Sequence, residues 1–148
     1  MDPLSVAGSI VGILTAAAKV IEIVEPYVSS TKDAPKIAVS VHSEVNRVRA
    51  VLSSLQSILQ NLSSPSTTPS RASFVQIDQL VVTFTDGVLI FSELESIVAP
   101  LMPPDQKQAL PIRQRLQWAA KKNALSNVLD KLQRFLVSLS AILNIFQW

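Results

Sequence analysis

The stretch IAVSVHSEVNRVRAVLSSLQSILQNL, residues 37–62, decides the fold of this chain. Its large apolar side chains recur at steps of three and four residues, which places them on one face of an α-helix. These side chains are Ile37, Val41, Val45, Val48, Leu52, Leu55, Leu59 and Leu62. A helix with one long apolar face buries that face against other helices. The stretch therefore predicts a helix that begins near Pro35, with Asp33 in its cap region, inside a helical bundle.

A helix is also predicted upstream, from about Pro3 to Glu25. Asp2 is a good N-cap, Pro3 suits the first helical position, and Pro26 is expected to end the helix. Its bulky side chains share one face: Val6, Ile10, Ile13, Ala17, Val20 and Val24, widened by Leu14 and Ile21.

Two more helices are predicted downstream. The first runs from about Phe74 to Val98, although residues 81–85 have a strand-like composition. A polar, proline-bearing loop at 63–73 precedes it, and Pro100, Pro103 and Pro104 follow it.

The last helix runs from Ile112 to Phe146, after a break or kink at Pro111. Lys121 falls on its apolar seam, so either this lysine extends its charge past the core or the helix bends near residues 122–123. The seam consists of Leu125, Leu129, Leu132, Leu136, Leu139, Leu143 and Phe146.

The composition fits this series of helices. The 148 residues suit a single domain spanning 1–148, with 48% apolar residues, 5% aromatic residues and no cysteine. The predicted fold class is all-α: an antiparallel helical bundle of about four to five helices, with an N-terminal hydrophobic, glycine-bearing helix at about 3–25.

Small residues form a stripe on the first predicted helix. Gly8, Gly12 and Ala16 recur every four residues, with Ser5 and Ser9 beside them, roughly opposite the bulky face. Such a stripe lets helices approach closely in lipid. An interior glycine costs roughly 0.5–1 kcal/mol of helix stability relative to alanine. The presence of both Gly8 and Gly12 in this helix therefore needs a structural or functional explanation. Close packing inside the bundle is the alternative to helix association in a membrane.

The N-terminus does not read as a signal peptide or as a permanent membrane anchor. Asp2 stands where a signal peptide carries positive charge. The uncharged run from Pro3 to Ala18 has 16 residues, short of the roughly 20 that span a bilayer. Conditional insertion remains compatible with this length.

Catalytic motifs are missing from the sequence. It contains no metalloprotease, phosphate-loop or nucleophile-elbow motif, and its single histidine, His42, suits a surface or interhelical position. Glu93 and Glu95 are two residues apart and therefore point in different directions on a helix. The sequence predicts no enzyme, no cofactor and no metal site.

Charge is distributed unevenly along the chain. Residues 1–100 hold six basic and nine acidic side chains, whereas residues 101–148 hold seven basic and two acidic ones. A solvated helix exterior is the simplest explanation of this basic C-terminal part; an anionic lipid surface comes second, and nucleic acid ranks below both. The candidate lipid-contacting residues, which spread around the helix, are Arg113, Arg115, Lys121, Lys122, Lys131 and Arg134. Trp118 is expected in the core.

Several segments resemble the fungal HeLo-like domains that precede the nucleotide-binding modules of NOD-like receptors. They are the opening MDPLSVAGSIVGILTAAAKV, residues 115–122 (RLQWAAKK), residues 128–134 (VLDKLQR) and residues 136–145 (LVSLSAILNI). This resemblance implies a helical bundle that targets membranes in regulated cell death, with residues 4–24 as the membrane-active element. The residues implied for insertion or helix association are Leu4, Ser5, Val6, Gly8, Ile10, Gly12, Ile13, Ala16 and Val20.

The leading hypothesis is therefore a membrane-permeabilising cell-death execution domain of fungal regulated necrosis, heterokaryon incompatibility and innate immunity. It would be cytoplasmic at rest and would reach the plasma membrane once oligomerisation activates it. Its expected partners are membrane lipids, further copies of itself, and a NOD-like receptor or amyloid-type signalling module. The alternative is a non-lytic adaptor bundle that mediates protein–protein contacts in such a receptor.

Overall fold

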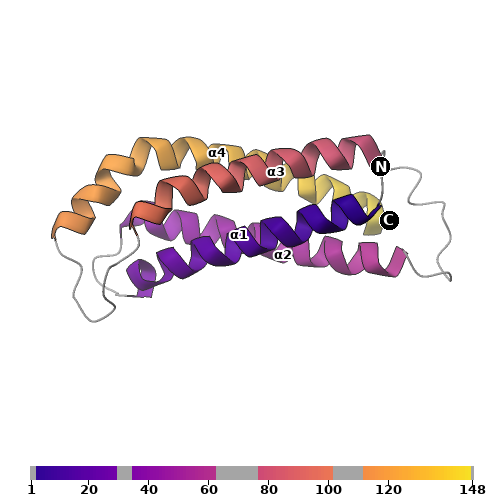
Figure 1. Ribbon diagram of the computed structural model, residues 1–148, viewed down its shortest axis with the longest axis horizontal. Coiled ribbons are helices and arrows are strands. Elements are labelled where there is room, and N and C mark those ends of the chain that lie inside the picture. The colour runs from indigo at the N-terminus through magenta and orange to yellow at the C-terminus, as the bar shows by residue number, and fades with distance from the viewer. Residues whose placement is uncertain (1–2, 30–34, 63–76, 102–111, 148) are drawn as a thin grey trace.

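The computed structural model describes the backbone at residues 3–29, 35–62, 77–101 and 112–147. Within these ranges the side chains of 3–7, 59, 61–62, 77–79, 112–115 and 146–147 are not described. The elements are α1 (Pro3–Ser29), α2 (Lys36–Leu62), α3 (Ile77–Val98), the 3₁₀ helix η2 (Ala99–Leu101) and α4 (Ile112–Gln147). Consecutive α-helices run antiparallel (Figure 1), so the predicted all-α antiparallel bundle is confirmed.

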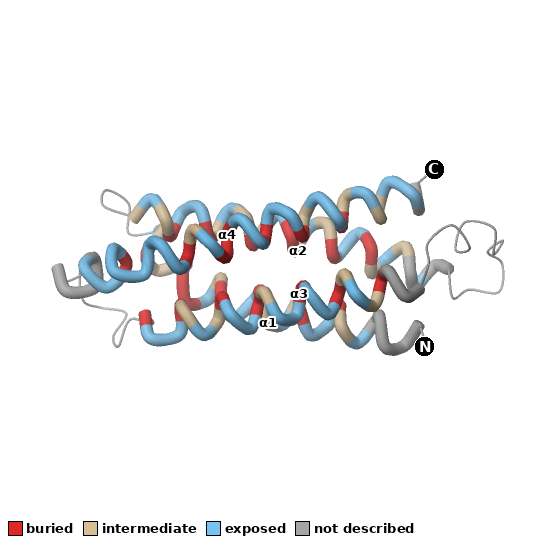
Figure 2. The backbone as a smooth tube through the Cα atoms, turned by 90° about the horizontal axis from the view of Figure 1, so that it is seen from above, coloured by how far each residue is buried: buried red, intermediate tan, exposed pale blue. Residues whose placement is uncertain are grey.

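The four helices are arranged as the corners of a square. α1 packs against α2 and α3, and α4 packs against the same two helices, so α1 and α4 are diagonally opposite (Figures 1 and 2). The neighbours α1 and α3 therefore run parallel to each other, as do α2 and α4. The chain between α2 and α3 connects two diagonal helices.

All four helices contribute to one core. Its largest fully buried side chains are Trp118, Tyr27, Phe84, Phe91, Ile10, Ile13, Leu52, Leu55, Leu94, Leu125, Leu132 and Leu139. In Figure 2 the buried positions of each helix face the inside of the bundle. The seam predicted for α2 is buried from Val41 to Leu55, and residues 81–85 are helical despite their strand-like composition, because the apolar period of α3 continues through them.

The prediction that Pro26 ends the first helix is wrong. α1 continues to Ser29 with Pro26 inside it. Tyr27 is fully buried, its hydroxyl donates to the carbonyl of Leu101, and its ring packs edge-on against Trp118 with the ring centroids 5.0 Å apart. A proline removes one helical hydrogen bond near the helix end, and the anchoring of Tyr27 outweighs that loss.

The other predicted boundaries lie close to the observed ones. α2 begins at Lys36, where the amide of Val39 donates to the carbonyl of Pro35 at 3.2 Å. The predicted loop at 63–73, Asp33 and Pro111 lie outside the described residues, as does the side chain of Phe146.

Lys121 is exposed although its spacing places it on the apolar seam. Figure 1 shows α4 curving, with its N-terminal part extending past the ends of the neighbouring helices. Lys121 lies between Trp118 and Leu125, which are both buried, so the bundle covers α4 on either side of it and the lysine side chain reaches solvent from the edge of that face.

Candidate functional site

The first candidate site is the surface of α1, which has two chemically different sides. Ile10, Ile13, Ala17 and Val20 are buried in the core, as predicted. Gly8 and Gly12 are exposed, and a Cβ built on either would have no atom within 4 Å. Close packing within the bundle therefore does not explain these two glycines.

The small-residue stripe is only partly open. Ser9 is half-buried, and Ala16 is half-buried and packs against the core. Gly8 and Gly12 form the open part, beside Val11, which is 51% exposed. The side chains of Leu4, Ser5 and Val6 lie outside the described part of the chain.

A salt bridge marks the C-terminal limit of this uncharged surface. Lys19 Nζ on α1 lies 2.9 Å from Glu95 Oε1 on α3. The hydrogen bond to Glu95 raises the pKa of Lys19 above its ordinary 10.5. The pair ties the parallel helices α1 and α3 together at the surface.

The glycine that does allow close packing is Gly87 on α3. A Cβ at this position would overlap the ring of Phe135 on α4, with Cε1 at 2.8 Å, and would lie 3.0 Å from Cδ1 of Ile13 on α1. Three helices therefore meet at one glycine. The sequence signal for this contact is a glycine inside a helical pattern, where glycine costs about 1 kcal/mol relative to alanine.

The candidate lipid-contacting cations do not form one patch. Lys121, Lys122, Lys131 and Arg134 are all exposed on α4, whereas the side chains of Arg113 and Arg115 lie outside the described residues. Lys131 and Lys121 are ten residues apart, which is about 15 Å along a helix. The four described cations therefore lie in two places, and of these four Lys131 and Arg134 border a hollow.

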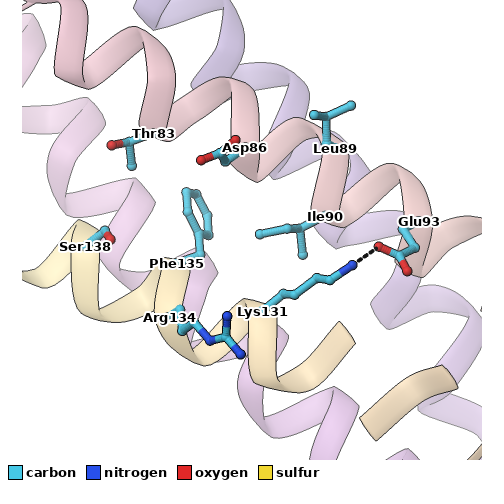
Figure 3. A pocket seen from close by; sticks show the side chains of 9 residues that line it. All are labelled: Thr83, Asp86, Leu89, Ile90, Glu93, Lys131, Arg134, Phe135 and Ser138. Carbon is cyan, nitrogen blue, oxygen red and sulfur yellow. Dashed lines mark hydrogen bonds and ion pairs between the residues drawn. The ribbon is translucent and has the colours of Figure 1, made fainter. Parts of the chain in front are cut away.

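That hollow is a groove of about 380 Å³ between α3 and α4, and it is the second candidate site. Ile90 and Phe135 supply apolar lining, and Thr83 and Ser138 lie at one end (Figure 3). The charged lining residues are Asp86 and Glu93 from α3, and Lys131 and Arg134 from α4. Sequence reasoning named the two bases but assigned no role to Asp86 or Glu93 opposite them.

An ion pair crosses the groove. Lys131 Nζ donates to Glu93 Oε2 at 2.9 Å (Figure 3). Glu93 thus points toward α4 and Glu95 toward α1, which confirms that the two carboxylates diverge. No polar contact links Asp86 to Arg134 among the described residues.

Two further polar contacts join helices without suggesting catalysis. His42 Nε2 on α2 lies 2.5 Å from Glu25 Oε2 on α1, so the histidine is interhelical. Burial raises the pKa of the Tyr27 hydroxyl above its ordinary 10.0, with a smaller opposing effect from the Trp118 indole. The His42–Glu25 pair and the hydrogen bond from the Tyr27 hydroxyl to the Leu101 carbonyl fix the mutual position of helices.

Across the described helices, none is long and apolar enough to cross a membrane.

In comparisons with known proteins, no family model, curated protein or solved structure matches this chain. The similarity to fungal HeLo-like domains therefore rests on the sequence motifs alone.

Proposed function

We propose that this chain is a non-enzymatic, membrane-permeabilising domain of the fungal HeLo-like type, which executes regulated cell death when it self-associates. One observation carries the proposal: α1 buries its bulky face in the bundle and leaves Gly8 and Gly12 open to solvent. A helix built for the bundle alone gains roughly 0.5–1 kcal/mol from alanine at each such exposed position. The retained glycines favour a second use of the same helix.

In this proposal α1 leaves the bundle on activation. Ile10, Ile13 and Val20 move from the core into lipid, an exchange between two apolar surroundings that costs little transfer free energy. Gly8 and Gly12 then permit helix–helix contact, which in lipid depends on close backbone approach.

The short uncharged segment of α1 makes this insertion conditional. α1 has 27 residues, but only its first 16, Pro3 to Ala18, are free of charge. A bilayer core takes roughly 20 apolar residues, so the uncharged part alone is too short for a stable span. Association of several copies supplies the remaining stabilisation in our proposal.

The proposed setting follows the family resemblance. The chain is cytoplasmic at rest and reaches the plasma membrane on activation by a NOD-like receptor or an amyloid-type module. The exposed cations Lys121 and Lys122 favour anionic headgroups, by up to about 1 kcal/mol per charge near such a surface.

The test is leakage of a dye from anionic liposomes. Gly8→Leu combined with Gly12→Leu should abolish leakage and leave the bundle folded, because both side chains extend into open space. The matched control is Ala50→Leu with Ser54→Leu, two exposed positions four residues apart on α2, which should leak like the wild type. Wild-type leakage by the glycine double variant would refute the role of α1.

A non-lytic adaptor bundle is the alternative. It predicts that the intact chain stays in the supernatant when it is sedimented with either neutral or anionic vesicles. The proposed domain sediments with anionic vesicles, so this experiment separates the two functions.

A further inference from the structure

The α3/α4 face segregates its charges by helix. Asp86 and Glu93 lie on the α3 side of the groove, and Lys131 and Arg134 lie on the α4 side (Figure 3). Asp86 and Glu93 are seven residues apart, two helical turns, so both point to the same side of α3. The face therefore carries an acidic row beside a basic row.

Apolar surface accompanies these charges. Leu89 lines the groove and is 63% exposed, and Val82 is 61% exposed. Val82, Asp86 and Leu89 follow one another at steps of four and three residues, so they share one side of α3. Protein interfaces typically have an apolar centre surrounded by a polar rim, and exposed apolar side chains bordered by charges can supply both.

We propose that the α3/α4 face binds a second copy of this chain, with the two copies parallel and related by a two-fold axis along the bundle. Rotation about such an axis places α3 of each copy opposite α4 of its partner. Each acidic row then faces a basic row, and the contact is made twice because a two-fold interface is self-complementary.

Charge selects this geometry over its alternative. A two-fold axis across the helices would place α3 against α3 and α4 against α4, so that like charges would oppose each other at a cost. The ion pair between Lys131 and Glu93 does not obstruct the proposed contact. Both side chains are about half exposed, and an exposed pair contributes about 0–1 kcal/mol, so exchanging partners costs little.

This inference rests on the proposed function in one respect: it identifies the surface for the self-association that the proposal requires. It uses no residue of α1 and its test uses no membrane. Failure here leaves α1-driven leakage standing, and failure of the leakage assay leaves this interface standing.

The first measurement is sedimentation velocity of the wild-type chain over a range of concentrations. We expect a monomer–dimer equilibrium whose dissociation constant rises by about tenfold or more between about 50 mM and about 500 mM salt, because screening weakens the opposed rows. A chain that stays monomeric up to about 1 mM overturns the proposal, since contacts of this strength associate below that concentration.

The second measurement uses complementary charge reversal. Asp86→Lys with Glu93→Lys gives an all-basic face, and Lys131→Glu with Arg134→Glu gives an all-acidic face. Each variant alone should be monomeric, and an equimolar mixture should form a heterodimer. Dimers of either variant alone, or a mixture that stays monomeric while the wild type dimerises, would refute the geometry.

Circular dichroism checks that the variants are folded. If a double variant does not fold, the single substitutions Asp86→Lys and Arg134→Glu repeat the test with one reversed charge each. We expect each to weaken the homodimer and the pair to recover affinity on mixing. If the mixed variants associate no more tightly than each variant alone, the proposed pairing is overturned.

Discussion

At the scale of single residues, the three glycines of this chain have opposite environments. Gly8 and Gly12 face open space, whereas Gly87 lies under the ring of Phe135 and beside Ile13. The same substitution at these sites therefore tests two different physical effects.

Gly87→Ala should lower the free energy of unfolding by about 1–3 kcal/mol, because the new methyl group overlaps the ring of Phe135 and crowds Ile13. Gly12→Ala should raise it by roughly 0.5–1 kcal/mol, because only helix propensity changes there. Urea denaturation of both variants measures the difference. Equal effects of the two substitutions would contradict the packing assigned to Gly87.

Tyr27→Phe tests the buried hydroxyl at the end of the bundle. Losing the donor to the Leu101 carbonyl should cost about 1–3 kcal/mol near neutral pH. Because the pKa of Tyr27 is raised in the folded chain, its contribution is complete below pH 10.0 and disappears as the pH rises through the folded value. The difference between wild type and variant should therefore shrink above pH 10.0, as followed by denaturation at several alkaline pH values.

Lys19 provides the control for this pH dependence. Its raised pKa also makes stability fall in the alkaline range, beginning near 10.5. Lys19→Met should remove the alkaline loss of stability that depends on Lys19 and keep the loss that depends on Tyr27. If Tyr27→Phe leaves the alkaline loss unchanged, Lys19 or another group carries it.

At the scale of helices, α1 shows how tertiary contacts override a local stop signal. Pro26 lacks the amide that would donate to the carbonyl of Glu22, yet the helix continues because Tyr27 is anchored between Trp118 and Leu101. On α4, Lys121 fits the core period but is exposed between the buried Trp118 and Leu125, so the period alone does not assign its burial.

Pro26→Ala should stabilise the chain by about 1 kcal/mol or more. Alanine restores an amide donor inside α1 and removes the clash of the proline ring, whose interior cost reaches about 3 kcal/mol. Thermal denaturation measures the change. A destabilised variant would mean that the proline ring itself packs favourably, since it is half-buried.

At the scale of the whole molecule, the square arrangement makes α1 and α3 parallel neighbours. They are joined at the surface by the Lys19–Glu95 salt bridge and in the core at Gly87. Release of α1, which the proposed function requires, must break both contacts. The groove between α3 and α4 is lined by residues of those two helices and by none of α1.

Crosslinking tests this requirement, and the cysteine-free chain makes it simple. Lys19→Cys with Glu95→Cys, joined by a reducible thiol crosslinker, should block liposome leakage by holding α1 on α3, and reduction should restore it. The matched control joins Ala50→Cys with Ser54→Cys, two exposed positions on α2, which leaves α1 free to move and keeps the charges of the α3/α4 face. Full leakage from the chain crosslinked between α1 and α3 would exclude release of α1.

The apolar periodicity of the sequence predicts the helices and their buried faces. Apolar side chains at three- and four-residue steps predict one buried face for each helix, and this is confirmed for α1 from Ile10 to Val24 and for α2 from Val41 to Leu55. Trp118 was likewise predicted in the core from its position on the apolar face of α4.

Which helices are neighbours follows from their packing in the fold, because periodicity shows which face is buried but not what covers it. The open surroundings of Gly8 and Gly12, the packed surroundings of Gly87 and the meeting of Asp86 and Glu93 with Lys131 and Arg134 all follow from that arrangement. A glycine's purpose depends on the distance to atoms far away in the sequence, and no local spacing encodes that distance.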